Sequence, residues 1–447
     1  MNPYTIPAPD PDEDTIFTFE DWKDHGMPAN LILAEGWTEI EDQMFVDDPD
    51  LQMIFIPASV VSIQEDAFNG AISLRQVEFA QGSRLEFIGD GAFAATQALE
   101  RINIPASVTH IGDRAFFGAT GLEEVIFEEG SQLEMIGFQT FSGATALQTI
   151  RIPASVKDID LEAFLGATGL REVAFEEGSK LEFIGDGVFA DATALQTIQI
   201  PTSVSYIGQG AFLNTTSLQT IQIPRLVDML MIHTFENATS LREVTFEEGS
   251  QLEFINDGAF SGAIALQTIQ IPVNVLSIGD QAFANTPSLR EITFERNSEI
   301  TTIDPNAFRE SGLTLVIIGE IALERLNVER NTLNLTPLHF GPNNNFYGRD
   351  NVTIVSRAQQ MYAFRGRRAP GYRQLPRDAK DYIAKFLMPP GAQPKSSAAP
   401  AALAARKGGT RKPRTRKRGI RRNSRKASST RRTKKGKSKR RRTMKRK

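Results

Sequence analysis

The sequence contains no cysteine and only four histidines, so several kinds of chemistry lack their usual residues. Without cysteine there can be no disulfide, no thiol nucleophile and no thiolate metal ligand. The histidines, His25, His110, His233 and His339, are far apart in the sequence and do not form the His-Glu-x-x-His spacing of zinc hydrolases. We therefore expect a protein that is not an enzyme, with no catalytic residue, no metal site and no cofactor.

Long hydrophobic runs are also missing, and no stretch is apolar enough to cross a bilayer. Residues 1–30 are rich in proline and acidic residues, and they lack the basic and apolar regions of a secretory signal. We expect residues 1–30 to form an acidic, proline-rich N-terminal arm, and we expect the protein to stay in a reducing, intracellular compartment.

The sequence does contain a regularly spaced phenylalanine, which returns every 23 or 25 residues. These core phenylalanines are Phe45, Phe68, Phe93, Phe116, Phe141, Phe164, Phe189, Phe212, Phe235, Phe260, Phe283 and Phe308. A fixed period in this range is typical of solenoids, in which stacked units share one core because no unit can bury its apolar face alone. The spacing therefore predicts a stack of similar turns.

Other apolar residues keep a constant distance from each core phenylalanine. Around Phe93, for example, Ile88 stands five residues before, and Leu99, Ile102 and Ile104 stand six, nine and eleven residues after. The last two positions have the alternation of a short strand with one face buried. Each unit is therefore expected to supply one strand and several core side chains, followed by a tight helical turn.

Two kinds of unit alternate along the chain. One reads Ile-Pro-x-Ser-Val after the strand, as in residues 104–108, and the other reads Phe-Glu-Glu-Gly-Ser-x-Leu, as in residues 127–133. Proline ends a strand because it has no N–H to donate, and glycine permits the same bend through a positive φ. The alternation slips once, where Pro201 and Pro224 belong to consecutive short units.

The motif Leu-x-x-Ile-x-Ile-Pro-x-Ser-Val-x-x-Ile-Gly-x-x-Ala-Phe-x-Gly-Ala, seen in residues 99–119, resembles the BspA-type leucine-rich repeat. The resemblance covers residues 31–320 and implies a solenoid of stacked short parallel strands that recognises proteins or surfaces, with no catalytic residues to carry over. Together with the basic C-terminal segment described below, the chain is also similar to proteins of protists and of their large DNA viruses.

One surface of the predicted solenoid can be proposed as a concave binding face, because side chains that alternate with the buried strand residues point away from the core. They are mostly Thr, Gln and Glu, and the candidates are Glu124, Thr149, Arg151, Glu172, Thr197, Gln199, Thr220, Gln222, Glu243, Thr268, Gln270 and Glu291. Such a face either binds a protein partner with an extended or repetitive surface or is a solvated ladder preserved by duplication. The paired acids Glu128-Glu129, Glu176-Glu177 and Glu247-Glu248 are expected to line up as an acidic stripe.

Residues 391–447 form the second notable feature, a linker followed by a strongly basic tail. Residues 406–447 contain 24 of the 50 Lys and Arg residues and no Asp or Glu, which leaves 26 basic and 54 acidic residues in the rest of the chain. A segment of this composition is expected to be disordered until it meets a polyanion. The candidate polyanion-binding residues are Arg411, Lys412, Arg414, Arg416, Lys417, Arg418, Arg421, Arg422, Lys434, Lys435, Lys437, Lys439, Arg440, Arg441 and Arg442.

Three hypotheses account for the basic tail. It can bind nucleic acid through phosphate contacts, it can serve as a nuclear or nucleolar address, or it can associate with an acidic solenoid in the same or another molecule. No aromatic residue lies in residues 406–447, so base stacking is not expected. If the source is a virus, a virion-associated location follows from the same charges.

Between the repeats and the tail, residues 321–390 break the period and are expected to cap the solenoid. Residues 346–355 resemble half a repeat, and residues 375–387 are predicted to form an amphipathic helix. The sequence at the ends of that helix is similar to the opening of an F-box, which would make the chain a substrate adaptor for a ubiquitin ligase. The favoured interpretation is a recognition scaffold with a polyanion-binding tail, and the alternatives are an assembly protein and this adaptor.

Overall fold

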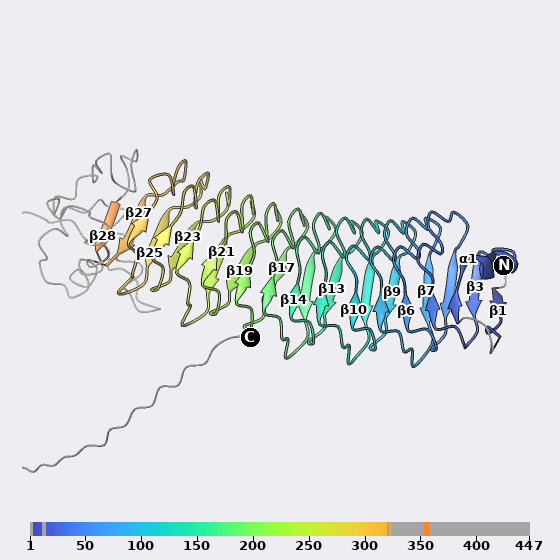
Figure 1. The fold of residues 1–447 in the computed structure, drawn as a ribbon. Helices are drawn as coiled ribbons and strands as arrows, with labels where there is room; N and C mark the ends of the chain where they lie inside the picture. The colour runs from blue at the N-terminus through green and yellow to red at the C-terminus, as the bar shows by residue number, and fades with distance from the viewer. Residues whose placement is uncertain (1–2, 11–14, 320–321, 323–352, 357–447) are drawn as a thin grey trace, which may run out of the picture. The chain divides into compact units, whose positions relative to one another are not determined.

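The strands of the solenoid are parallel and lie in two rows, because each turn places two short extended segments side by side with those of the next turn (Figure 1). The structure is a computed structural model that describes residues 3–10, 15–319, 322 and 353–356. The long-strand row contains β1 (Tyr4–Ile6), β3 (Asn30–Leu33), β5 (Met53–Ile56), β7 (Gln76–Phe79), β9 (Arg101–Ile104), β11 (Glu124–Phe127), β13 (Thr149–Ile152), β15 (Glu172–Phe175), β17 (Thr197–Ile198), β19 (Thr220–Ile223), β21 (Glu243–Phe246), β23 (Thr268–Ile271), β25 (Glu291–Phe294), β27 (Leu315–Ile318) and β28 (Thr353–Ser356).

The short-strand row consists of two-residue strands that precede each core phenylalanine. Its members are β2 (Ile16–Phe17), β4 (Glu39–Ile40), β6 (Ser62–Ile63), β8 (Phe87–Ile88), β10 (His110–Ile111), β12 (Met135–Ile136), β14 (Asp158–Ile159), β16 (Phe183–Ile184), β18 (Tyr206–Ile207), β20 (Met229–Leu230), β22 (Phe254–Ile255), β24 (Ser277–Ile278) and β26 (Thr302–Ile303). The second residue of each strand is buried, and the first is half-buried or exposed, except for Ser62 of β6, which is buried. This second row was not predicted from the sequence, although its inward isoleucines were.

Register between turns places equivalent repeat residues next to each other. In the long-strand row Ile150 of β13 pairs with Val173 of β15, and in the short-strand row Ile159 of β14 pairs with Ile184 of β16. Each repeat position therefore forms a column along the solenoid. The predicted fold, a repeat solenoid of stacked parallel strands, is confirmed.

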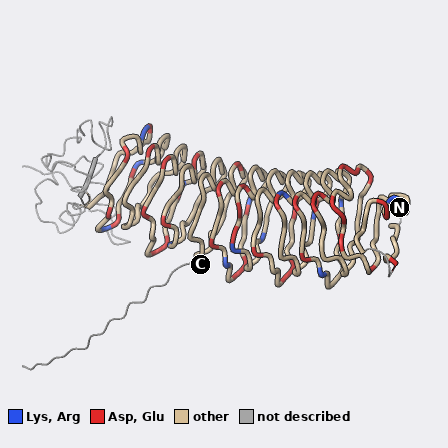
Figure 2. Tube along the Cα trace, in the orientation of Figure 1, with Lys and Arg blue, Asp and Glu red and all other residues tan. Residues whose placement is uncertain are grey.

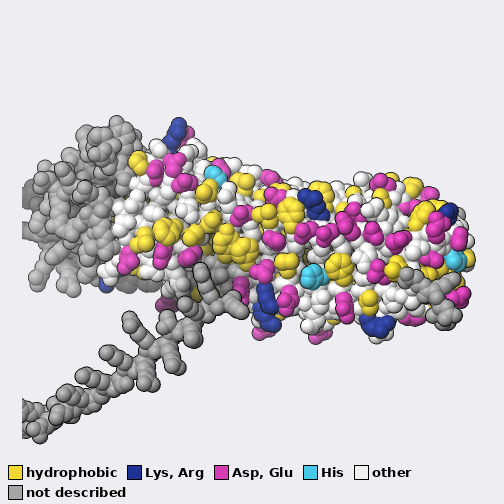
Figure 3. Space-filling view, viewed as in Figure 1, with side chains coloured by type: hydrophobic (Ala, Val, Ile, Leu, Met, Phe, Trp, Pro, Cys, Tyr) yellow, Lys and Arg dark blue, Asp and Glu magenta, His cyan; other side chains and the backbone are white. Residues whose placement is uncertain are grey.

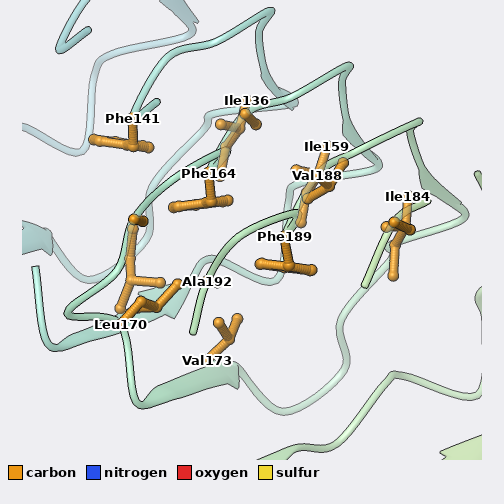
Figure 4. Close-up of a cluster of buried hydrophobic side chains, with 14 of the residues drawn as sticks. Ile136, Phe141, Ile159, Phe164, Leu170, Val173, Ile184, Val188, Phe189 and Ala192 are labelled. Atoms are coloured by element: carbon orange, nitrogen blue, oxygen red, sulfur yellow. The ribbon is translucent and has the colours of Figure 1, made fainter. Parts of the chain in front are cut away.

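The core phenylalanines form one continuous stack inside the solenoid. Phe141, Phe164 and Phe189 are fully buried, and the ring centroids of adjacent members lie 5.3 and 5.5 Å apart (Figure 4). Their planes differ by only 15° and 14°, so the rings lie nearly parallel, as the repeat geometry requires. Ile136, Ile159 and Ile184 line the core beside them (Figure 4).

The segment around each core phenylalanine is a series of hydrogen-bonded turns rather than a helix. The N–H of Phe117 bonds to the Arg114 carbonyl, while the N–H of Phe116 bonds to Thr140 in the next unit. Because these N–H groups alternate between partners within the turn and in the next turn, the chain curls tightly without building a regular helix. Gly121 is needed here, since a Cβ at this position would clash with the Gln97 backbone carbonyl.

The N-terminal end of the core is closed by α1 (Phe19–Asp24). Thr18 and Asp21 form a capping box at its start, with side-chain acceptors for each other's backbone N–H. Trp22 is buried, and its ring packs edge-on against Phe45 with the centroids 4.8 Å apart. Trp22 lies 23 residues before Phe45, so it occupies the position of a core phenylalanine one turn earlier.

The boundaries differ from the sequence expectation at the N-terminus. β1 pairs with β3 and β2 pairs with β4, so the solenoid includes part of residues 1–30, which were expected to form a separate arm. At the other end β28 continues the long-strand row beside β27, in the region expected to resemble half a repeat. The amphipathic helix expected at residues 375–387 lies outside the described residues.

Candidate recognition surfaces

The outward face of the long-strand row carries the side chains predicted for a binding face. Thr149, Glu172 and Thr197 are adjacent in register and exposed, because the strand alternation buries Ile150, Val173 and Ile198 instead. The other predicted residues that are exposed are Arg151, Gln199, Thr220, Gln222, Glu243, Thr268 and Gln270. Glu124 is half-buried and Glu291 is buried, so these two do not share the full exposure that the sequence pattern predicts.

Several polar side chains of this face pair across turns. Nε of Arg101 lies 2.7 Å from Oε2 of Glu124, and Nε2 of Gln270 donates a hydrogen bond of 2.9 Å to Oε1 of Glu295. The pairs are exposed, so they hold side-chain positions more than they stabilise the fold. Acidic residues outnumber basic ones along the described chain (Figure 2), and a partner of this solenoid therefore meets a mainly negative surface.

The paired acids have a structural role that the sequence did not reveal. Oε2 of Glu128 accepts a hydrogen bond from the Ala106 N–H, 3.1 Å away in the preceding turn, and Ala106 directly follows Pro105. The same bond recurs from Ala154 to Glu176, from Arg225 to Glu247 and from Val273 to Glu295. The first glutamate of each pair thus bonds the turn made by a proline unit, while Glu129, Glu177 and Glu248 are exposed.

A column of Asp and Asn side chains, made of Asp191, Asn214 and Asn237, joins turns along one edge of the solenoid. The side-chain amide of Asn214 donates to Oδ1 of Asp191 at 2.8 Å, and that of Asn237 donates to Oδ1 of Asn214 at 3.0 Å. All three residues have φ values between 57° and 59°, a region that Asn and Asp tolerate better than other residues with a Cβ. We assign this column a structural role, because its polar groups form hydrogen bonds with each other.

The short-strand row carries an apolar band on its outward side. Phe183, Tyr206, Met229 and Phe254 are the first residues of β16, β18, β20 and β22, and each is partly exposed. The rings of Phe183 and Tyr206 stack with their centroids 4.5 Å apart and their planes 2° apart. Figure 3 shows hydrophobic side chains gathered in the middle of this face, with acidic side chains around them.

Sequence reasoning missed this band, which consists of Phe183, Tyr206, Met229 and Phe254. We call it the aromatic band because three of its four members are aromatic. A signal was present, because each member stands six residues before a core phenylalanine, from Phe189 to Phe260. At other turns the same position varies, and it holds Ser62 and Ser277, His110 and Asp158, and also Phe87 and Met135. The band is therefore set apart by a large side chain of low polarity at this position in four consecutive turns, which the fold does not require.

The surroundings of the aromatic band are electronegative. Burial and the nearby carboxylate of Glu182 raise the pKa of Asp158, which pairs in register with Phe183. Burial and the charge of Asp186 raise the pKa of Tyr206, and a hydrogen bond to the Asp186 carboxylate adds to this effect. Both shifts follow from the difficulty of placing a further negative charge on this face.

The structure shows no candidate metal-binding cluster among the residues it describes. Within residues 3–10 and 15–319, no group of three or more His, Asp or Glu side chains is arranged to hold a metal ion. In the same part of the chain, no helix has the length and apolar character needed to cross a membrane. The candidate polyanion-binding residues of the tail, Arg411 to Arg442, lie outside the described residues.

Parallel strands stacked turn upon turn around one shared core define the chain as a repeat solenoid. The sequence model of the BspA type leucine rich repeat region matches it in six copies, over residues 38–171, 128–238 and 233–327. The chain therefore belongs to the BspA-type leucine-rich-repeat family. No curated protein matches the sequence.

Solved structures with a similar chain include bacterial leucine-rich-repeat proteins. The pneumococcal vaccine antigen PcpA is 26% identical, with 63% of this chain and 73% of that chain covered and a TM-score of 0.46. A leucine-rich repeat protein from Bacteroides ovatus is 22% identical, with 72% and 88% covered and a TM-score of 0.49. One from Eubacterium ventriosum is 22% identical, with 69% and 89% covered and a TM-score of 0.42.

Proposed function

We propose that this protein is a non-enzymatic recognition scaffold, whose solenoid binds a protein partner and whose basic residues 406–447 bind nucleic acid or another polyanion. The outward face of the long-strand row supports the first part most directly. The turns from β7 to β23 each present there at least one exposed side chain that the core does not use, about 4.8 Å from the equivalent residue of the next turn. Extended surfaces of this kind are what repeat solenoids use to bind macromolecules.

The charge distribution of the sequence supports the second part. With 24 basic and no acidic residues in residues 406–447, the tail can neutralise several phosphates and release their counterions. The lack of aromatic residues there favours contacts to the phosphate backbone over base stacking. Binding should therefore be insensitive to nucleotide sequence and steeply weakened by salt.

Affinity purification of the full-length chain and of a variant lacking residues 406–447 tests both parts at once, if nucleic acid and protein are measured in each sample. Nucleic acid should accompany the full-length chain alone, while proteins bound to the solenoid should accompany both. Replacing Thr220 and Gln222 with arginine should release proteins that use the long-strand face. Equal amounts of nucleic acid in both samples would contradict the role of the tail.

The opposite charges of the two parts of the sequence favour a second candidate, an assembly protein. Outside residues 406–447 the chain has 26 basic and 54 acidic residues, so a tail could associate with another molecule's acidic surface. Light scattering should then show oligomers that dissociate as salt is raised. A strict monomer at low salt would contradict it.

The F-box-like adaptor role rests on residues 375–387 and predicts that adaptor subunits copurify.

A further inference from the structure

The aromatic band on the short-strand row has the features of a second docking site, separate from the long-strand face. Phe183 pairs in register with Tyr206, and Met229 pairs with Phe254. The two pairs come from four consecutive turns, and β18 contacts β20 between them without hydrogen-bonded strand pairing. Exposed Leu161 and Ile232 lie in the turns that follow two of the short strands, which adds further apolar surface. Contiguous exposed apolar surface of this kind marks interaction sites on soluble proteins.

The fold does not need these side chains at this position. Ser62 and Ser277 take the same place in β6 and β24, and their turns keep the same pairing and the same buried phenylalanines, Phe68 and Phe283. Because serine is accepted at this position in other turns, the apolar side chains there contribute little to the stability of the core. The partial exposure of these apolar side chains is then better explained by a role in binding a partner.

Acidic side chains border the band and restrict what can cover it. Glu182, Asp228 and Glu253 directly precede three of its members and are exposed, and Asp186 and Asp257 follow on the other side. None of the residues that directly precede a band member, or that follow it by three positions, is Lys or Arg. A second copy of the band would bring like charges together, and nucleic acid would be repelled.

The spacing of the band suits a helix that lies along the solenoid. Its members are separated by about 4.8 Å per turn, whereas an α-helix advances about 5.4 Å per turn and presents one residue per turn on a given line. Over four turns the two spacings differ by only about 2 Å. An amphipathic helix can therefore place apolar residues at i, i+4, i+7 and i+11 on the band.

We propose that the aromatic band binds a basic amphipathic helix of a partner protein, with apolar residues on Phe183, Tyr206, Met229 and Phe254 and with Lys or Arg beside Glu182, Asp228 and Glu253. The inference rests on the proposed recognition function and specifies the chemistry of a partner. The chain's own basic tail fits less well, because among residues 406–447 only Ile420 and Met444 are large and apolar. The tail therefore cannot place four apolar residues along one side of a helix.

The test uses the full-length protein and a panel of labelled 16-residue peptides. Each peptide carries Leu, Ile, Met or Phe at the four apolar positions and Lys or Arg on both flanks, and each has a scrambled partner of identical composition. Fluorescence anisotropy should show binding of peptides from the ordered set and at least about tenfold weaker binding of their scrambled partners. The absence of binding by every ordered peptide would overturn the proposal.

Two variants locate the binding. Tyr206→Ser with Phe254→Ser introduces the residue that other turns already carry, so circular dichroism and the melting temperature should barely change while peptide affinity falls at least about tenfold. Glu182→Gln, Asp228→Asn and Glu253→Gln together should weaken binding at low salt and flatten its salt dependence. Unchanged affinity in the serine variant would overturn the proposal, and so would equally tight binding of a peptide of residues 406–447.

These variants leave the long-strand face and the tail unchanged. A negative result with the peptides therefore removes the aromatic band as a docking site, while the copurification of proteins and nucleic acid tests the proposed function by itself.

Discussion

The backbone N–H of Ala154 donates a hydrogen bond to Oε2 of Glu176, 3.0 Å away in the following turn. Ala154 follows Pro153, which ends its strand, and Glu176 belongs to the longer kind of unit. The two kinds of unit are therefore complementary, because the second supplies the acceptor for the turn made by the first. Where the alternation slips, Thr202 follows Pro201, and the next turn carries Pro224 in place of a glutamate pair.

This relationship predicts that the two glutamates of one pair differ in their contribution to stability. Replacing Glu176 with alanine removes the acceptor of the Ala154 N–H and should lower the free energy of unfolding by about 1 kcal/mol. Replacing the exposed Glu177 should change it by less than about 0.5 kcal/mol. Urea denaturation of both variants provides the comparison, and equal losses would mean that the bond does not matter.

The stack of core phenylalanines predicts a large and position-specific loss of stability. Phe164→Ala removes a fully buried ring that stacks on two neighbours, so the free energy of unfolding should fall by roughly 3 to 5 kcal/mol. Phe117 is the matched control, because its side chain is 42% exposed. Its replacement with alanine should cost less than about 0.5 kcal/mol in the same denaturation experiment. Similar losses in the two variants would contradict the stack.

Two aspartates should affect the pH dependence of stability with opposite sign. The pKa of Asp158 is raised from its ordinary value of 3.8, mainly by burial, so the folded protein binds this proton more readily than the unfolded chain. Stability contributed at Asp158 therefore falls as pH rises from 3.8 through the folded pKa. Asp158→Asn should raise the melting temperature at pH 7 and give no gain at pH 3.

Asp280 provides the contrast. Hydrogen bonds from Gln281 and Asn306 lower its pKa, so its contribution to stability is present above pH 3.8 and is lost as pH falls through the lower folded pKa. Asp280→Asn should lower the melting temperature at pH 7 and have little effect at acidic pH. Melting curves of both variants across pH check the signs, and two shifts in the same direction would contradict these assignments.

The column formed by Asp191, Asn214 and Asn237 predicts a conformational requirement at Asn214. Its side chain bonds to both Asp191 and Asn237, and its φ is 59°. Asn214→Ala loses both hydrogen bonds and keeps an unfavourable backbone, and should cost about 1 to 3 kcal/mol. Asn214→Gly loses the same bonds but accepts the φ value, so it should cost less in the same denaturation assay. A greater loss in the glycine variant would contradict this account.

Most of the core could be predicted from the sequence, because the period fixes which residues face inward. Leu99, Ile102 and Ile104 are all buried, as their distances from Phe93 indicate. The first turn was not predicted, because Trp22 replaces the phenylalanine and Phe17 replaces the isoleucine that comes five residues earlier. A search for any large apolar residue at the repeat distance would have found both.

The surfaces were less predictable, because exposure depends on neighbouring turns. Glu128 and Glu176 looked like parts of an acidic stripe, and only the register shows that each accepts a bond from the preceding turn. Phe183 and Phe254 were not noticed, although they stand at a fixed distance from the core phenylalanines, because the period alone does not show that a side chain at that distance is partly exposed. Glu291 fits the exposed pattern in sequence but is buried in its turn.

The division of roles between solenoid and tail is tested most directly by titrating a fluorescent 20-base-pair DNA duplex with the full-length protein at several salt concentrations. The control is a variant in which the Lys and Arg of residues 406–447 are replaced by Gln and Ser. We predict that the logarithm of the affinity falls linearly with the logarithm of the salt concentration, by about 0.9 per phosphate contacted, and that the control does not bind. Equal affinity of both proteins, or affinity that salt does not change, would contradict the account.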